Sequence, residues 1–275
     1  MTKKLTSIGL TLSLLFAVST VLAKSNSIQV TNPSSNTFSL PTHAVQVADN
    51  VFSLGQAIDP ATGQLAQGYA IIHYRQAFHH RPGHNGGPGG GGEVPTCYTY
   101  VFEGKTKWKS VEGWVTNTAN TRGLGSAFVF DTITAGIAKW ENAAGVNILG
   151  DGTITNDSLF ADSVSPDNQN EVYFADIAED GAIGVTIVWK TIFKNQLIEW
   201  DQIYDDIDFD WSSDGSAGKM DFDNIATHEL GHSVGMGDIY NVACSNVTMY
   251  GFADFGETNK RTLEPADITG VSALY

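Results

Sequence analysis

Basic residues are scarce in this sequence of 275 residues. Fifteen Lys and Arg stand against thirty Asp and Glu, so the formal net charge is −15 at pH 7. Nucleic acids and anionic membranes attract positive charge, and we therefore expect neither of them as a partner. An excess of acidic residues favours solubility outside the cell. Acidic loops can also hold calcium, which is one candidate ion.

Long apolar runs are missing except at the very start. An apolar run over residues 8–18 follows Lys3 and Lys4 and precedes a small-residue cleavage signal at residues 21–23. This is the pattern of a secretory signal peptide over residues 1–23, too short for a comfortable membrane span. We predict a secreted, extracellular protein without membrane attachment after removal of the signal, and we expect it to be a monomer.

Cysteine is nearly absent, since only Cys97 and Cys244 occur. In an exported protein a single disulfide between them is the default. It would tie the start of the main domain to a loop near the end of the chain. The alternative is that Cys97 is a free thiolate that caps a metal ion. We favour the disulfide because it uses both cysteines.

Residues 24–95 form a leading segment that differs from the rest of the chain. Two strand-like stretches, residues 51–54 and 69–74, flank a turn signal at residues 59–63. A single hairpin buries little surface by itself. It must therefore pack on the domain that follows or be removed later. We assign residues 24–95 to a pro-segment or N-terminal extension.

A glycine-rich linker at residues 86–92 ends this segment. Such a linker is a good site for proteolytic removal of whatever precedes it, and we place the main domain at residues 96–275. Three histidines stand just before the linker: His79, His80 and His84. They could hold a metal ion, but we favour the simpler interpretation as solvated linker residues.

The main domain mixes strands and helices. Apolar residues recur at helical spacing over residues 125–144, which predicts a long amphipathic helix. A second helix is predicted at residues 221–234 and a third at residues 264–274. The predicted strands are residues 98–102, 171–175 and 182–190, a strand beginning near Trp114, and at least one strand within 197–209.

The most informative stretch lies within the second predicted helix. It reads His-Glu-x-x-His from His228 to His232, followed by Gly235 and Asp238. Residues four apart share one face of a helix, so both imidazoles can bind one metal ion. Glu229 can then act beside that metal as a general base. Gly235 allows the positive φ that a turn out of the helix requires.

The third ligand cannot be a downstream histidine, because no histidine follows His232. Asp238 and Glu257 are the carboxylates that we consider. Asp238 comes six residues after His232, directly beyond the Gly235 turn, whereas Glu257 lies in a loop rich in Gly, Thr and Asn. We favour Asp238 for its proximity. Zinc with three protein ligands keeps a fourth position for water.

These features resemble the metzincin metalloproteases, most closely the matrixin-like branch in which aspartate is the third zinc ligand. The resemblance rests on the motif from His228 to Asp238, on residues 247–251 around Met249, and on the closing residues 263–275. It covers about residues 97–275. It implies an α+β fold with a twisted mixed sheet, an edge strand lining the cleft, a long backing helix, a zinc-binding helix and a C-terminal helix.

The resemblance also implies roles for individual residues. Met249 would form a methionine turn that gives the zinc ligands an apolar floor. Residues 182–190 would be the edge strand against which an extended substrate binds, and residues 250–261 would wall the pocket next to the scissile bond. Gly251 stands where some branches carry a tyrosine ligand, so we assign none. The expected cleft residues are Ile183, Gly184, Val185 and Tyr250.

The predicted function is that of a zinc metalloendopeptidase acting on protein or peptide substrates. Zinc would acidify its bound water and polarise the peptide carbonyl, while Glu229 takes the proton and passes it to the leaving amine. The Asp238 carboxylate cancels part of the metal charge, which predicts an alkaline activity optimum. Two alternatives stay open: a non-catalytic, zinc-stabilised extracellular binding domain, and a peptidase of the gluzincin type with Glu257 as ligand.

Overall fold

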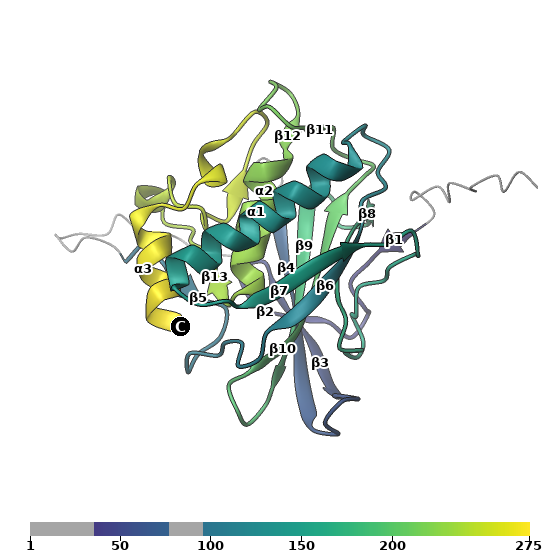
Figure 1. The fold of residues 1–275 in the computed structure, drawn as a ribbon, viewed down its shortest axis with the longest axis vertical. Coiled ribbons are helices and arrows are strands. Elements are labelled where there is room, and N and C mark those ends of the chain that lie inside the picture. Colours follow the sequence, from purple (N-terminus) through teal and green to yellow (C-terminus); the bar gives the residue numbers. More distant parts are fainter. Residues whose placement is uncertain (1–35, 77–95) are drawn as a thin grey trace, which may run out of the picture. The chain divides into compact units, whose positions relative to one another are not determined.

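The computed structural model describes residues 36–76 and 96–275, which belong to one compact unit (Figure 1). No helix within these two ranges is long and apolar enough to cross a membrane. Some predictions fall outside the described residues: the signal peptide 1–23, the linker at 86–92, and the histidines His79, His80 and His84. They stay predictions.

A mixed sheet forms the centre of the fold. Five strands from residues 96–275 are neighbours in it, in the order β7, β6, β8, β10, β9. Their bounds are Leu149–Ile154 for β7, Glu112–Asn117 for β6, Asn170–Ile177 for β8, Leu197–Asp205 for β10 and Ala182–Thr191 for β9. The first four run parallel, and β9 is antiparallel to β10. The expected mixed sheet is therefore confirmed, with β9 outermost among these five strands.

The leading segment adds a hairpin to this sheet. β3 (Val51–Ile58) and β4 (Leu65–Arg75) are antiparallel, and β2 (Val45–Ala48) pairs with the outer side of β3. Gly63, in the turn between β3 and β4, has a φ of 68°, in keeping with the turn signal. β4 in turn pairs with β9. The hairpin therefore packs on the main domain, one of the two outcomes that its small size allowed.

Short strands tie loops to this framework. β1 (Thr37–Phe38) pairs with β8, and β14 (Phe252–Ala253) runs parallel to the end of β4. The strand predicted at 98–102 is shorter, because only β5 (Thr99–Tyr100) pairs with the two residues of β13 (Met236–Gly237). The other short elements are β11 (Trp211–Ser212), β12 (Met220–Asp221), and the 3₁₀ helices Val242–Cys244 and Asn259–Arg261.

The three predicted helices form close to their expected positions. They are α1 (Ser126–Ala144), α2 (Phe222–Ser233) and α3 (Pro265–Leu274). α1 lies across the sheet in Figure 1, and its Trp140 Nε1 donates a hydrogen bond of 2.9 Å to Thr227 O of α2. Asp221 caps α2 by accepting from Asn224 N at 3.0 Å. The sheet and α1 thus hold α2 from two sides.

Two apolar clusters occupy the two faces of the sheet. Trp200 and Tyr204 of β10 join Ile133 of α1 and Leu230 of α2 in the larger cluster. Ile203, the neighbour of Tyr204, belongs to the second cluster on the opposite face. Strands buried on both faces are apolar at successive positions. This explains why β9 is a nearly continuous apolar run, whereas β10 also carries buried polar residues such as Glu199 and Asp201.

Candidate metal centre and active site

The three predicted metal ligands converge at one point. His228 and His232 lie one turn apart on α2, and Asp238 directly follows β13. The Nε2 atoms of His228 and His232 lie 3.2 and 3.4 Å from Asp238 Oδ1. The side chains of both histidines are fully buried, and that of Asp238 is 4% exposed. Two nitrogens and one oxygen therefore meet in a space from which bulk water is excluded.

Gly235 makes the turn that brings Asp238 back to the helix. Its φ is 102°, in the region where residues with a Cβ atom are strained. A Cβ atom at this position would also lie 3.1 Å from Leu274 Cδ2 and 3.2 Å from Thr106 O. The predicted positive φ is confirmed, and tight packing gives a second reason for glycine.

The backbone orients both imidazoles. The Nδ1 atom of His228 lies 2.7 Å from Thr248 O, and that of His232 lies 2.9 Å from Met236 O. A carbonyl oxygen only accepts, so each Nδ1 carries a proton and each Nε2 is the ring atom that can bind a metal ion. This is the usual outer support of metal-binding histidines.

Each ligand keeps one buried atom without a hydrogen bond. Within the described parts of the chain, His228 Nε2, His232 Nε2 and Asp238 Oδ1 have no hydrogen-bond partner. Asp238 Oδ2, in contrast, accepts from the Tyr240 hydroxyl at 2.8 Å. Buried polar atoms are normally satisfied, so unpartnered atoms that face one another indicate a missing ligand. An N, N, O donor set of this kind fits zinc.

The charge distribution agrees with a cation at this point. Burial lowers the pKa of His228 to about 4, which keeps its imidazole neutral. Burial also favours neutral His232, but the Asp238 carboxylate outweighs it and raises the pKa of His232 to about 9. The two histidines hold the pKa of Asp238 well below its usual value in spite of its burial. Without a metal, the carboxylate thus draws a proton onto His232.

Glu229 lies beside this group, on the side of β9. Its Oε2 accepts from Thr186 Oγ1 at 2.6 Å, and a Cβ atom added at Gly184 would lie 3.3 Å from its Oε1. Burial raises the pKa of Glu229 to about 7. A carboxyl group with a pKa near neutrality can both take up and release a proton.

The expected cleft residues lie in different surroundings. Gly184 faces Glu229, whereas Ile183 and Val185 are buried in apolar clusters on opposite faces of the sheet. Only the backbone of Ile183 and Val185 can therefore serve a substrate. Tyr250 follows the methionine turn, half-buried, with its ring centroid 5.7 Å from that of Phe252.

His73 of β4 joins the site, although no role was predicted for it. Its Nδ1 lies 3.1 Å from Glu229 Oε1, and its ring centroid lies 4.0 Å from that of His228. Burial holds the pKa of His73 well below its usual value, so the ring is neutral. The available signal was a histidine inside an otherwise apolar strand, which is unusual unless the side chain has a partner.

Lys260 is a second residue that the motif did not point to. It is fully buried, its Nζ donates to Phe252 O, and burial lowers its pKa to about 8. Lys260 Nζ also lies 3.7 Å from Glu257 Oε1. The cluster of possible ligands around His228 and His232 includes Asp238 and, among the described residues, not Glu257.

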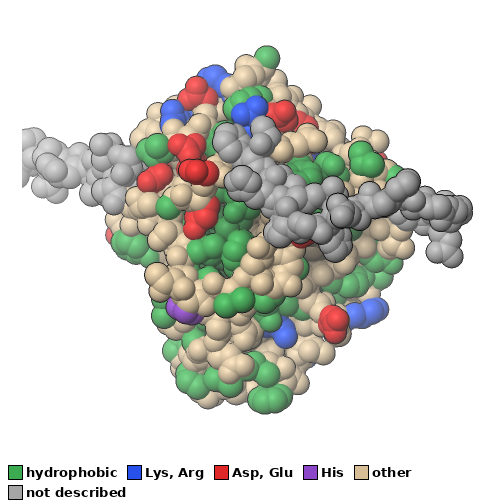
Figure 2. All heavy atoms as spheres, turned by 180° about the vertical axis from the view of Figure 1, so that it is seen from behind, with side chains coloured by type: hydrophobic (Ala, Val, Ile, Leu, Met, Phe, Trp, Pro, Cys, Tyr) green, Lys and Arg blue, Asp and Glu red, His purple; other side chains and the backbone are tan. Residues whose placement is uncertain are grey.

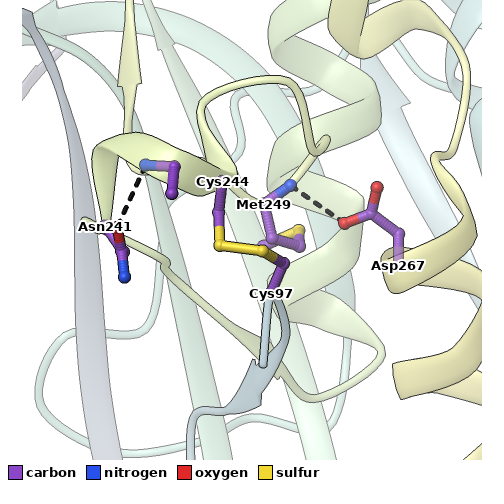
Figure 3. The surroundings of a disulfide bond; sticks show 6 residues. Cys97, Asn241, Cys244, Met249 and Asp267 are labelled. Atoms are coloured by element: carbon purple, nitrogen blue, oxygen red, sulfur yellow. Dashed lines mark hydrogen bonds between the residues drawn. A yellow bond between two sulfur atoms is a disulfide. The ribbon is translucent and has the colours of Figure 1, made fainter. Parts of the chain in front are cut away.

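The loop that carries Met249, the expected methionine turn, packs against α2. Met249 is fully buried, and a Cβ atom added at Gly231 would lie only 2.2 Å from Met249 Sδ. Asp267 at the start of α3 accepts from Thr248 N at 2.8 Å. It also accepts from Met249 N at 3.2 Å, as Figure 3 shows. The C-terminal helix therefore holds the loop that carries Met249 and the carbonyl of Thr248.

A disulfide joins Cys97 to Cys244, as predicted, with their Cα atoms 5.4 Å apart (Figure 3). It connects the chain just before β5 to the 3₁₀ helix Val242–Cys244 in the loop between Asp238 and Met249. Both sulfur atoms are used in this bond. The alternative of a free Cys97 thiolate that caps the metal is therefore wrong.

A second group of acidic residues lies away from α2. Carboxylate oxygens of Asp162, Asp167 and Glu199 come within 4.8 Å of one another. Burial and neighbouring carboxylates raise the pKa of Asp162 to about 6 and that of Glu199 to about 11. Glu199 is fully buried, and its Oε1 has no hydrogen-bond partner among residues 36–76 and 96–275.

Comparison with known proteins supports the interpretation of the main domain. Residues 101–275 match the matrixin family, and no curated protein matches the chain. The match covers more than half of the sequence and contains the whole of α2, the methionine turn and α3. The chain therefore belongs to the matrixin family, and its main domain is that of a metalloprotease.

Proposed function

We propose that this protein is a zinc-dependent endopeptidase with His228, His232 and Asp238 as metal ligands and Glu229 as general base. The proposal rests on one observation. Within the described residues, the three atoms that could bind the metal, His228 Nε2, His232 Nε2 and Asp238 Oδ1, are buried and have no hydrogen-bond partner. A carboxyl group with a pKa near 7 stands next to them. This arrangement supports hydrolysis of peptide bonds in protein or peptide substrates.

Zinc, when bound, supplies a water of lowered pKa and polarises the substrate carbonyl. Glu229 takes the proton during attack and delivers it to the leaving amine. The Thr186 hydroxyl holds Glu229 Oε2 and thereby orients the other carboxyl oxygen. Met249 gives the ligands an apolar floor, and the carbonyls of Thr248 and Met236 keep both imidazoles in the required tautomer.

The alternative of a non-catalytic, zinc-stabilised binding domain is weaker. Structural zinc sites are held by four protein ligands and have no use for an additional general base. In this chain Glu229 is buried beside the ligands and bonded to Thr186. Burial of a carboxyl group costs free energy, and carboxyl groups with strongly shifted pKa values are concentrated at catalytic sites.

The test is a comparison of zinc content and hydrolysis. Purified protein is freed of its leading segment by limited digestion and incubated with a peptide mixture, and mass spectrometry identifies the cleaved bonds. Glu229→Gln should keep one zinc per chain and lose at least about a hundredfold in rate. Glu103 is exposed, and Glu103→Gln is the matched control, which should keep both the zinc content and the rate of hydrolysis of the wild type. Hydrolysis that survives Glu229→Gln or chelation would overturn the proposal.

We also propose that the protein is exported, that residues 1–23 are a signal peptide, and that it acts as a monomer outside the cell. Acidic side chains gather near the top of the face drawn in Figure 2, in keeping with the net charge of −15. The N-terminus of protein recovered from the culture medium tests the signal, and light scattering tests the monomer. Recovery of an uncleaved chain from the cell interior would contradict this part.

Calcium is the second ion that we propose, at Asp162, Asp167 and Glu199. Three carboxyl groups within 4.8 Å disfavour ionisation of one another, and a hard cation with oxygen ligands removes that penalty. The unpartnered Glu199 Oε1 gives such an ion a ready ligand among the described residues. Its role would be structural, because the cluster shares no member with the zinc ligands.

A further inference from the structure

Asp238 comes from a loop, whereas the other two proposed ligands come from a helix. His228 and His232 lie one turn apart on α2, and the helix itself keeps their side chains on one face. Asp238 follows β13 and has no such restraint from its own element. A carboxylate can bind a metal ion through one oxygen or through both. The contacts of residues 238–240 therefore decide how Asp238 would bind.

The backbone attaches this loop to the segment that carries Met249. Ile239 N donates to Met249 O at 2.8 Å, and Gly251 N donates to Ile239 O at 2.9 Å. Ile239 and Tyr250 thereby form an isolated parallel bridge. These bonds hold the backbone next to Asp238 against a loop that packs on α2. They leave the rotation of the Asp238 carboxyl group open.

The Tyr240 hydroxyl fixes that rotation. It donates to Asp238 Oδ2 at 2.8 Å, since a carboxylate oxygen only accepts. The other oxygen, Oδ1, lies 3.2 Å from His228 Nε2 and 3.4 Å from His232 Nε2. Within the described ranges Oδ1 has no hydrogen-bond partner. One oxygen of the carboxylate is thus held by the phenol, and the other faces the two imidazoles.

Gly251 leaves the space in which the Tyr240 ring lies. A Cβ atom at Gly251 would be 2.4 Å from Tyr240 Cε1 and 3.0 Å from the hydroxyl oxygen. The Phe252 ring packs against the same tyrosine, with 5.2 Å between ring centroids. A side chain at position 251 would therefore displace the ring, and the hydroxyl group with it.

A second hydrogen bond holds the hydroxyl group from its other side. Asn50 Nδ2 donates to the Tyr240 hydroxyl at 2.8 Å, and Asn50 is itself buried. A hydroxyl group that accepts one hydrogen bond and donates another is held in one rotation, and the bonds of such a chain strengthen one another. The chain from Asn50 through Tyr240 ends on Asp238 Oδ2, the oxygen that does not face the histidines.

We infer that Tyr240 is a positioning residue that restricts Asp238 to a single metal-binding oxygen, Oδ1, and thereby favours zinc over cations of higher coordination number. This inference rests on the proposed metal site. One carboxylate oxygen and two imidazole nitrogens leave one position open in the tetrahedral geometry that zinc prefers. If Oδ2 were released, it would add a further oxygen donor, which suits manganese better than zinc.

The structural alternative is that Tyr240 only fills space and holds the loop. Its ring packs against Gly251 and Phe252, and this packing is kept when tyrosine is replaced by phenylalanine. Loss of the hydroxyl group would then change the stability of the loop and weaken the binding of every metal alike. The relative affinity for two metals therefore separates the two roles.

The first test measures metal selectivity on the full-length chain. Competition with a chromophoric chelator gives the dissociation constants for zinc and for manganese. Tyr240→Phe should weaken zinc binding about tenfold or more, since outer contacts to metal ligands are worth about 10–100-fold. Manganese binding should stay the same or become tighter, because Oδ2 is released as a further oxygen ligand. Tyr98→Phe, at another half-buried tyrosine, is the matched control and should keep both constants.

The second test reports on coordination directly. Cobalt replaces zinc, because its visible absorption weakens when a ligand is added to a tetrahedral site. Cobalt-saturated Tyr240→Phe should absorb more weakly than the wild type. Gly251→Ala should do the same although it keeps the hydroxyl group, because the added Cβ atom displaces the ring.

Two results would overturn the inference. One is a Tyr240→Phe protein with the cobalt spectrum and the zinc-to-manganese preference of the wild type. The other is a variant that loses affinity for zinc and manganese by the same factor, which would leave Tyr240 a structural role only. A wild type that binds neither metal would instead refute the proposed metal site itself.

Discussion

His73 Nδ1 lies 3.1 Å from Glu229 Oε1, and both side chains are fully buried. The two residues are separated by 156 positions in the chain and come from β4 and α2. This contact joins the leading segment to the proposed general base. It makes the leading segment part of the site in the full-length protein. The predictions on activity are therefore tested on protein freed of this segment.

Asp238→Ala should abolish tight zinc binding. It removes the only carboxylate among the described residues that groups with both His228 and His232. Loss of a ligand should raise the zinc dissociation constant by about a hundredfold or more, since outer-shell changes alone cost 10–100-fold. Competition with a chromophoric chelator measures this. Glu257→Ala is the control, and full zinc retention by Asp238→Ala would favour Glu257 as ligand.

Activity should be highest on the alkaline side of neutrality. Glu229 must be ionised to accept a proton, and burial raises its pKa to about 7. The carboxylate of Asp238 also cancels one unit of metal charge, which raises the pKa of the bound water relative to a site with three imidazoles. Both effects make kcat/KM increase as the pH rises through this range. The pH–rate profile of the shortened protein tests this, and an acid limb well below pH 6 would count against it.

Asp267→Ala should destabilise the methionine turn. The change leaves the buried N–H groups of Thr248 and Met249 without their acceptor. We expect the free energy of unfolding to fall by about 1–3 kcal/mol, measured by urea denaturation. Asp131→Ala, exposed on α1, is the matched control and should stay within about 0.5 kcal/mol of the wild type. Equal stability of the two variants would show that Asp267 does not hold the turn.

Calcium should reverse a loss of stability at higher pH. Burial raises the pKa of Glu171 to about 7 and that of Asp162 to about 6, both above their unfolded values. The folded state then binds more protons than the unfolded state, so stability falls as the pH rises from about 4.5 through 7. A bound cation removes this penalty. Melting temperatures at pH 5 and pH 8, with and without calcium, test the prediction.

Glu199→Gln separates the calcium effect from general screening by salt. It replaces a carboxyl group that keeps its proton at pH 8 without calcium, because the pKa of Glu199 is about 11, so the melting temperature of the calcium-free protein should change little. The calcium response should become smaller in the same variant. Magnesium and sodium at equal ionic strength serve as controls. A melting temperature that ignores calcium in the wild type would remove the proposed site.

Local spacing accounts for much of the main domain. The apolar period over residues 125–144 predicted α1 to within one residue. The motif from His228 to Asp238 needs only a helix and a glycine turn, and both occur. The two cysteines predicted the disulfide because an even pair in an exported chain has one simple pairing. In these cases the partners lie close in sequence, or only one pairing exists.

The contacts of His73, Lys260 and Asp267 were decided by the tertiary structure. An apolar pattern shows that β4 and β9 are strands to be buried, but it does not say which strand will be the neighbour of which. That choice depends on the packing of both faces of the sheet. It also depends on the segment after α2, in which β14 pairs with β4. The sequence by itself determined a helix with two histidines on one face, a glycine turn and a nearby aspartate. Only the folded chain placed a third histidine against the base, because pairing between strands more than a hundred residues apart is set by the whole core.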